Sequence, residues 1–301
     1  MIEQDLNLSP EETERLLKAL RNASLPENRK YRYNYIRDNC STRIIGQIDN
    51  AASETIIYPD TVEYGTFRNE MRAYHKNYPW YQFGIDLALG SGLDHPLTSR
   101  EEMFVPVELM KKARGAVFKD GRPLVKTERV LNEGSDKAVE PPTYWAFGPL
   151  FCCCLVAAIA IAVCIYEFKT GRIIKSFNFI WFFVLGLAGC LIAFLVFISV
   201  HAATSPNALI FWLNPFQWLM CIGLSAKKFK LLSQAMAWYN LVGVGALMIA
   251  WGFITQSANP AFYPLMGATV ILGGSYAIIA RKSSYNNNGH KRKPNVAKKK
   301  K

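Results

Sequence analysis

Five long apolar segments in the second half of the chain restrict its fold more than any other feature of the sequence. They are Trp145–Tyr166, Phe177–Val200, Ala208–Leu224, Ala235–Ile254 and Ala261–Ala280. A helix needs about 20 apolar residues to cross the hydrocarbon core of a bilayer, and most of these segments are that long. The third is shorter and contains Asn214-Pro215, which predicts a kinked or half-inserted helix. Residues 143–282 are therefore predicted to form an all-α membrane domain of about five helices.

The connections between these segments predict how the helices are oriented. The basic connections contain Lys169, Arg172 and Lys175, then Lys227, Lys228 and Lys230, and finally Arg281 and Lys282. The other two connections, at residues 201–207 and 255–260, contain no Lys or Arg. Because basic loops stay in the cytoplasm, we expect a cytoplasmic tail at residues 283–301 and residues 1–142 on the outer side. The tail has almost no large apolar residues and is predicted to be disordered.

The charge distribution excludes several classes of function. The net charge is +12, and residues 143–301 contain 15 of the 35 basic residues but only one acid, Glu167. These bases form short clusters between apolar runs, unlike the basic face of a nucleic-acid-binding domain. The spans contain essentially no charge, which argues against an ion-coupled transporter. The cysteines form no CxxC pair, so a zinc ribbon or thioredoxin-type site is excluded, and we expect no metal or cofactor.

The polar half, residues 1–142, is predicted to form one modest domain of helices and strands. Its first helix begins at Ser9-Pro10, ends at Leu25-Pro26 and presents an apolar face made of Leu16, Leu17 and Leu20. The other expected elements are a strand at Tyr31–Ile36, a helix after Cys40 with Ile44, Ile45 and Ile48 as its apolar positions, helices at Phe67–Trp80 and Glu101–Ala113, a strand at Lys126–Leu131 and a linker at Asp136–Pro142.

Cys40 is the residue of the polar half with the most distinctive chemistry. The other six cysteines lie in apolar segments, where a buried or lipid-facing role is the simplest interpretation. Cys40 stands where the predicted strand meets the next helix, and the positive end of a helix stabilises a thiolate. Arg37 and Arg43 act in the same direction. Cys40 is therefore a candidate nucleophile, with a buried structural thiol as the alternative.

The run from Asn7 to Ile48 resembles the Lnb-type periplasmic domain family of bacteria. The resemblance centres on Tyr33–Arg43, which is similar to the family's signature of aromatic residues, an acidic residue and Asn-Cys. Further similar positions are Leu87–Gly90 with Asp94, Met103–Pro106, His201, Asn207 and Leu213-Asn214-Pro215. The similarity extends over most of the chain outside the tail.

This resemblance implies an α+β papain-like domain of the permuted thiol-enzyme type, in the periplasm and attached to the bacterial inner membrane. It implies an N-acyltransferase in which the Cys40 thiolate takes an acyl chain from a phospholipid as a thioester. The N-terminal amine of a lipoprotein would then receive the chain. Asp38 and Asn39 would orient the site or help to stabilise the oxyanion. The implied partners are the phospholipid donor, bacterial lipoproteins and membrane lipid.

The beginning of the chain departs from the family pattern. Family members carry an export signal followed by a Gly-His motif, which is expected to supply the general base. This chain begins at Met1, shortly before the first predicted helix. From this we expect a domain that is incomplete at its N-terminus, and a chain that is inactive in N-acylation as written.

The four histidines of the chain offer few substitutes for that base. Three are expected to be solvated or structural: His75, His95 and His290. His201 lies between the second and third spans, on the Cys40 side of the membrane, and is either an interfacial residue or a support for the thiol site. Arg43 and Asn207 are the other candidate auxiliary residues.

Three functions remain open at this point. The first is the membrane-bound thiol acyltransferase. The second is an N-truncated, non-catalytic membrane protein that keeps surfaces for lipid or lipoprotein. The third is a thiol peptidase or amidase acting on cell-wall peptides, because papain-like folds also carry out those reactions.

Overall fold

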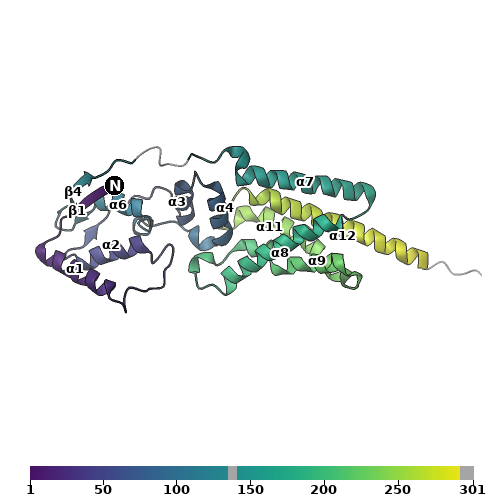
Figure 1. The fold of residues 1–301 in the computed structure, drawn as a ribbon, viewed down its shortest axis with the longest axis horizontal. Helices are drawn as coiled ribbons and strands as arrows, with labels where there is room; N and C mark the ends of the chain where they lie inside the picture. Colours follow the sequence, from purple (N-terminus) through teal and green to yellow (C-terminus); the bar gives the residue numbers. More distant parts are fainter. Residues whose placement is uncertain (135–140, 292–301) are drawn as a thin grey trace, which may run out of the picture. The chain divides into compact units, whose positions relative to one another are not determined.

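The computed structural model describes the backbone of residues 1–134 and 141–291, and side chains as far as Arg281 (Figure 1). The predicted linker Asp136–Pro142 falls mostly outside the described residues. Contacts divide the chain into two compact units. The N-terminal unit contains Met1–Tyr78, Gly92–Pro142 and His201–Ala203, and the C-terminal unit contains Pro79–Ser91, Thr143–Val200 and the residues from Thr204 on.

The N-terminal unit combines short helices and strands around a small apolar core. Its helices are α1 (Pro10–Ser24), α2 (Cys40–Ala51), α3 (Phe67–Tyr74), α5 (Ser99–Glu102) and α6 (Pro106–Gly115). Its described strands form two antiparallel pairs, β1 (Ile2–Leu6) with β4 (Val125–Val130) and β2 (Ile56–Ile57) with β3 (Val117–Phe118). The core includes Ile45, Ile48, Met103, Phe118 and Leu124. Strand β4 confirms the strand predicted at Lys126–Leu131, whereas β1 had no counterpart in the prediction.

The strand predicted at Tyr31–Ile36 is wrong, because this stretch forms a tight turn. The Asn34 side-chain oxygen accepts hydrogen bonds from the backbone N–H groups of Ile36 and Arg37, both at 3.1 Å. Asn34 and Asp38 also exchange backbone hydrogen bonds of 3.0 and 3.2 Å. An Asn side chain that bonds to the backbone two or three residues ahead favours a turn over an extended strand.

Helix α1 begins where the sequence predicts, but it buries a different face. Ser9 caps the helix, and the backbone N–H of Ser9 donates to the Glu12 carboxylate at 2.8 Å in a capping box. The predicted apolar face is largely solvated, since Leu17 and Leu20 are 48% and 47% exposed. The buried residue of α1 is Glu12, at 1% exposure.

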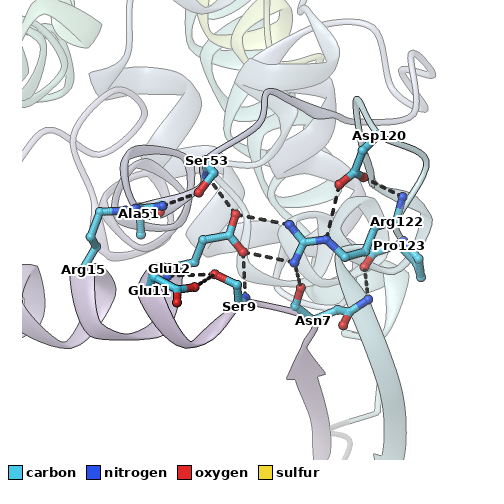
Figure 2. A network of polar contacts seen from close by, with 10 residues as sticks. All are labelled: Asn7, Ser9, Glu11, Glu12, Arg15, Ala51, Ser53, Asp120, Arg122 and Pro123. Carbon is cyan, nitrogen blue, oxygen red and sulfur yellow. Dashed lines mark hydrogen bonds and ion pairs between the residues drawn. The ribbon is translucent and has the colours of Figure 1, made fainter.

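Polar contacts therefore attach α1 to the rest of the unit (Figure 2). The Arg122 guanidinium reaches the two Glu12 oxygens at 3.0 and 3.2 Å, and the Ser53 N–H donates to Glu12 at 2.8 Å. Arg15 extends the network by donating to the Ala51 carbonyl at 2.8 Å. A fully hydrogen-bonded carboxylate tolerates this burial because each bond replaces a lost water contact.

Two helices predicted as single elements are each interrupted at a proline. The helix expected at Phe67–Trp80 ends at Tyr74, and α4 (Pro79–Ala88) begins afterwards. The helix expected at Glu101–Ala113 is divided into α5 and α6, with Pro106 at the start of α6. Proline fits the first turn of a helix but removes a hydrogen bond and clashes inside one, so each helix restarts there.

The described part of the C-terminal unit contains five helical segments long and apolar enough to cross a membrane. These are Pro149–Thr170 (α7), Lys175–Phe197 (α8), Ala208–Ser225, Lys227–Phe253 and Phe262–Arg281. The third is broken into the short turns Ala208–Phe211 and Pro215–Gln217 before α9 (Trp218–Ser225), which confirms the predicted kink. The fourth consists of α10 (Lys230–Trp238), a π-helical stretch at Tyr239–Val244 and α11 (Gly245–Ala250).

The last helix extends further than the sequence suggested. Helix α12 runs from Phe262 to Lys291, so its backbone continues into the segment predicted to be disordered from Ser283. No proline follows Pro264 in the chain before Pro294, so nothing in this stretch forces the helix to stop. Residues 292–301 lie outside the described part of the chain.

Several buried polar side chains in the C-terminal unit form hydrogen bonds within small groups. The amides of Gln217 and Asn240 exchange hydrogen bonds of 2.8 and 3.0 Å. The carboxylate of Glu167, fully buried, accepts from Asn178 at 2.7 Å and from Ser275 at 2.6 Å. Water is scarce inside a membrane domain, so these partners replace it.

Helix α4 belongs by its contacts to the C-terminal unit, although it precedes the first span by some 60 residues. The Phe83 ring lies 5.1 Å from the Phe262 ring at the start of α12. The Asn259 amide donates to Asp86 at 2.9 Å, and the Asn207 amide donates to the Leu87 carbonyl at 3.0 Å. The domain division predicted at residue 142 did not anticipate this grouping.

Candidate active site

A pocket of about 350 Å³ in the N-terminal unit contains the one cysteine of the polar half. Cys40 is the first residue of α2 and carries an exposed, free thiol. The pocket is lined by Tyr33, Tyr35, Asn39, Cys40, Met71, Tyr74, His75, Phe104, Val105 and Pro106. The prediction that Cys40 begins a helix is confirmed, and the alternative of a buried structural thiol does not fit its exposure.

Asn39 holds Cys40 in place by using every hydrogen-bonding position of its amide. The Asn39 oxygen accepts from the N–H groups of Ser41 and Thr42 at 2.9 and 3.0 Å. The Asn39 nitrogen donates to the carbonyls of Tyr35 and Phe104 at 3.0 and 2.9 Å. Because both of its N–H groups are engaged, this arrangement favours a positioning role for Asn39 over donation to an oxyanion.

Asp38 and Arg43 form an ion pair beside the site. The Arg43 guanidinium contacts both Asp38 oxygens, at 2.6 and 2.9 Å, and lies 3.5 Å from the centre of the Tyr31 ring. Hydrogen bonding from Arg43 holds the pKa of Asp38 below its usual range. Neither residue lines the pocket, so they brace the turn that leads into Cys40.

His75 is the histidine that lines the Cys40 pocket, and sequence reasoning had assigned it a solvated or structural role. It caps the C-terminal end of α3, with its backbone N–H bonded to the Met71 carbonyl at 2.9 Å. Met71 and Tyr74 belong to the same turn of α3 and share the pocket wall. No local motif marks His75, because its place in the pocket depends on the fold bringing the end of α3 and the start of α2 to the same cavity.

The other candidate residues lie elsewhere. His95 stacks edge-on against Phe67 at 5.3 Å and contacts the Pro96 carbonyl. Asn207 is buried in the C-terminal unit, where its oxygen accepts from Leu209 and Gln256. His201 is not among the residues that line the Cys40 pocket, and His290 lies beyond the described side chains.

The pocket offers further groups suited to acyl chemistry. Cys40 is the first helical residue, so its backbone N–H has no partner within the helix, and the same is true of other first-turn donors. Ser41 and Thr42 give their N–H groups to Asn39, which leaves that of Cys40 as the nearest donor for an oxyanion. Burial, and then the neighbouring Cys40, raise the pKa of Tyr33, so its phenol stays protonated and can donate.

Comparison with protein families matches both halves of the chain. The Lnb N-terminal periplasmic domain matches residues 1–70, which include Cys40 and α2. The Lnb transmembrane domain matches residues 141–284, which include all five candidate spans. No curated protein and no solved structure matches the chain. With a periplasmic domain followed by several membrane-spanning helices, this multi-pass membrane protein belongs to the Lnb family.

Proposed function

We propose that this protein is a lipoprotein N-acyltransferase that uses Cys40 as its nucleophile. His75, which lines the same pocket, would supply the general base, and this proposal replaces the expectation that the chain is inactive. The observation that carries the proposal is an exposed, free thiol at the start of a helix, in a pocket that an imidazole also lines. Membership of the Lnb family supports lipoprotein modification at a membrane. The papain-like arrangement implied by the sequence is part of the proposal, since a thiol at a helix start is the feature such enzymes need.

The first half-reaction removes an acyl chain from a phospholipid. The Cys40 thiolate attacks the ester carbonyl, the new C–S bond forms, and the C–O bond to glycerol breaks. The imidazole of His75 first takes the proton from the thiol. It then donates this proton to the lysophospholipid alkoxide as that group leaves. The Cys40 N–H and the Tyr33 phenol stabilise the oxyanion that exists after the C–S bond forms and before the C–O bond breaks.

The second half-reaction acylates the lipoprotein. The free α-amine of its N-terminal cysteine attacks the thioester, the amide bond forms and the C–S bond breaks. A proton from the amine returns the thiolate to the thiol through His75. Because the thiol and the spans belong to one chain, the reaction takes place in the membrane that holds both substrates.

Mass spectrometry of lipoprotein N-termini tests this function in a strain that relies on this protein. We expect Cys40→Ser to abolish N-acylation, and Cys154→Ser, at an exposed cysteine of α7, to leave it unchanged. His75→Gln should reduce acylation at least tenfold, while His95→Gln should not. Undiminished acylation by the Cys40→Ser variant would refute the mechanism.

A second measurement separates acyl transfer from thiol peptidase activity. The purified protein in phospholipid vesicles should accumulate an acyl group on Cys40 that hydroxylamine removes, when no lipoprotein is present. A thiol peptidase or a non-catalytic binding protein would acquire no such group.

The proposed location is the bacterial inner membrane, with residues 1–142 in the periplasm and the tail after Ser283 in the cytoplasm. It rests on the alternation of basic and uncharged connections. Single cysteines replacing Ser205 and Ser284 in a cysteine-free chain should label from outside and inside, respectively. Labelling of the Ser284 position from outside would reverse the topology.

A further inference from the structure

Three carboxylates meet inside the N-terminal unit, behind the Cys40 pocket. They come from Glu70 of α3, Glu102 of α5 and Glu108 of α6, and all three side chains are at most 2% exposed. One oxygen from each lies within 4.8 Å of the other two. Like charges this close repel one another strongly when buried, so the cluster needs compensating positive charge.

Two of the three carboxylates have cationic partners. The ammonium group of Lys112 lies 2.8 Å from Glu102, and that of Lys111 lies 2.6 Å from Glu108. Glu108 also accepts from the Tyr74 hydroxyl, and Glu102 from the Glu63 backbone N–H at 2.7 Å. Neutralisation of the cluster is therefore incomplete, because three buried acids face two lysines.

Glu70 is the carboxylate of the three that has no lysine partner among the described ion pairs. Its side chain is fully buried, and neither of its oxygens has a hydrogen-bond partner in the described part of the chain. Buried carboxylates are normally hydrogen-bonded, and a bound cation would give Glu70 the partner that it lacks among the described residues.

We propose that Glu70, Glu102 and Glu108 bind a calcium ion. Calcium takes oxygen ligands at 2.3–2.6 Å, so oxygens on opposite sides of it stand up to about 5 Å apart, which the three glutamates already satisfy. A ligand set made only of carboxylates suits a hard cation, and it lacks the nitrogen and sulfur atoms that favour zinc. Magnesium fits less well because it demands shorter, octahedral contacts.

The site has a route for the ion and room for water ligands. A cavity of about 340 Å³ reaches Glu102 and Glu108, and Thr61 and Glu63 also line it. Lys111 lines the same cavity with a side chain that is 42% exposed, so its ammonium group can turn outward when the cation enters. Waters in this cavity would complete the six to eight ligands that calcium takes.

An ion here would fix the wall of the Cys40 pocket. Glu70 directly precedes Met71 and lies about one turn before Tyr74 in α3, and Glu108 lies two residues after Pro106 in α6. Met71, Tyr74 and Pro106 line the Cys40 pocket. Calcium would thus clamp α3 to α5 and α6. This role is positioning, since none of the three glutamates lines the Cys40 pocket.

Calorimetric titration of the EDTA-washed full-length protein with calcium chloride, in non-ionic detergent micelles, tests the proposal. We expect one calcium ion per chain, and no displacement by a tenfold excess of magnesium. Glu70→Gln keeps the shape of the side chain but should weaken calcium binding at least tenfold. Glu63→Gln, at a 53% exposed carboxylate of the same cavity, should change it less than about twofold.

A stability measurement covers the case in which a variant binds nothing because it is unfolded. Saturating calcium should raise the unfolding midpoint of the wild-type chain by about 5 °C or more, and leave that of Glu70→Gln unchanged. Absence of calcium binding by the folded wild type would overturn the proposal, as would equal binding by Glu70→Gln. Neither readout depends on acyl transfer, so the result stands apart from the proposed activity.

Discussion

The N-terminal and C-terminal units bury polar groups in different chemical forms. In the N-terminal unit they are often full charges joined in pairs, as in Arg68 with Asp94 and Arg122 with Glu12. In the C-terminal unit the interior pair Gln217 and Asn240 is neutral. Burying an ion pair costs a large desolvation free energy, which the attraction between the two charges offsets only when their geometry is excellent. Burying an amide pair costs much less. The N-terminal unit therefore pairs buried charges with opposite charges, whereas the buried carboxylates of the C-terminal unit, Glu167 and Asp86, accept hydrogen bonds from amides and a hydroxyl.

Removing one partner of a buried ion pair should give the largest effect on stability. The side chains of Arg68 and Asp94 are 0% and 4% exposed and meet at 2.8 Å. We expect Arg68→Ala to lower the free energy of unfolding of the N-terminal unit by about 3–5 kcal/mol, because it leaves Asp94 buried without its partner. Urea unfolding of the full-length protein in micelles, followed by protease protection of the N-terminal unit, measures this.

Its control is an exposed ion pair in the same unit. Arg129 is 60% exposed and contacts Glu3 at 3.1 Å. Arg129→Ala should cost less than about 1 kcal/mol. If both variants lost the same stability, burial would not distinguish the two pairs.

Acid should destabilise the same unit through Glu12, by a somewhat smaller amount. The hydrogen bonds from Arg122 lower the pKa of Glu12 to about 2, below its usual value of 4.5. A carboxyl whose pKa is lowered by folding stabilises the protein above its unfolded pKa, and that stability is lost as the pH falls from about 4.5 to 2. The loss should reach about 3 kcal/mol.

Substitution at Glu12 provides the check. Glu12→Gln should be less stable than the wild type at pH 7, and the difference should shrink as the pH approaches 2. Glu14→Gln, at an exposed position of the same helix, should follow the wild-type pH curve closely. A difference between Glu12→Gln and wild type that does not change with pH would contradict the assignment.

The smallest effect is expected for the amide pair in the membrane domain. Gln217→Leu leaves the Asn240 amide without its partner and should cost about 1 kcal/mol, as is typical of hydrogen bonds between membrane helices. The double variant Gln217→Leu with Asn240→Leu should recover most of the loss. Unfolding in mixed micelles of increasing SDS content measures both, and additive losses would show that the two amides act separately.

Local patterns in the sequence predict part of this molecule well. The apolar segments predict the five candidate spans, including the kink before Pro215, because membrane insertion depends on composition over about 20 residues. Ser9 and Cys40 mark helix starts correctly, because capping needs only neighbouring residues.

Features that depend on packing between distant segments were not predictable in this way. His75 lines the Cys40 pocket because the fold brings residues 35 positions apart to one cavity, and no spacing in the sequence indicates this. Glu70, Glu102 and Glu108 are up to 38 residues apart and meet through the fold alone. The turn at Asn34 replaces a predicted strand. Alternating tyrosines are typical of a strand, but here the Asn34 side chain accepts a hydrogen bond from the Ile36 backbone and closes a turn.

The four hydrogen bonds of Asn39 have a consequence for the order of the residues before Cys40. Asp38 and Asn39 have side chains of nearly the same shape, yet they cannot exchange places. At position 39 one oxygen of a carboxylate would replace the amide nitrogen and face the carbonyls of Tyr35 and Phe104, at 3.0 and 2.9 Å, where the amide donates. Deamidation of Asn39 would therefore convert two attractive contacts into repulsive ones without changing the volume of the side chain. The position of Cys40, the proposed nucleophile, thus depends on a neighbour whose deamidation would leave the shape of its side chain unchanged.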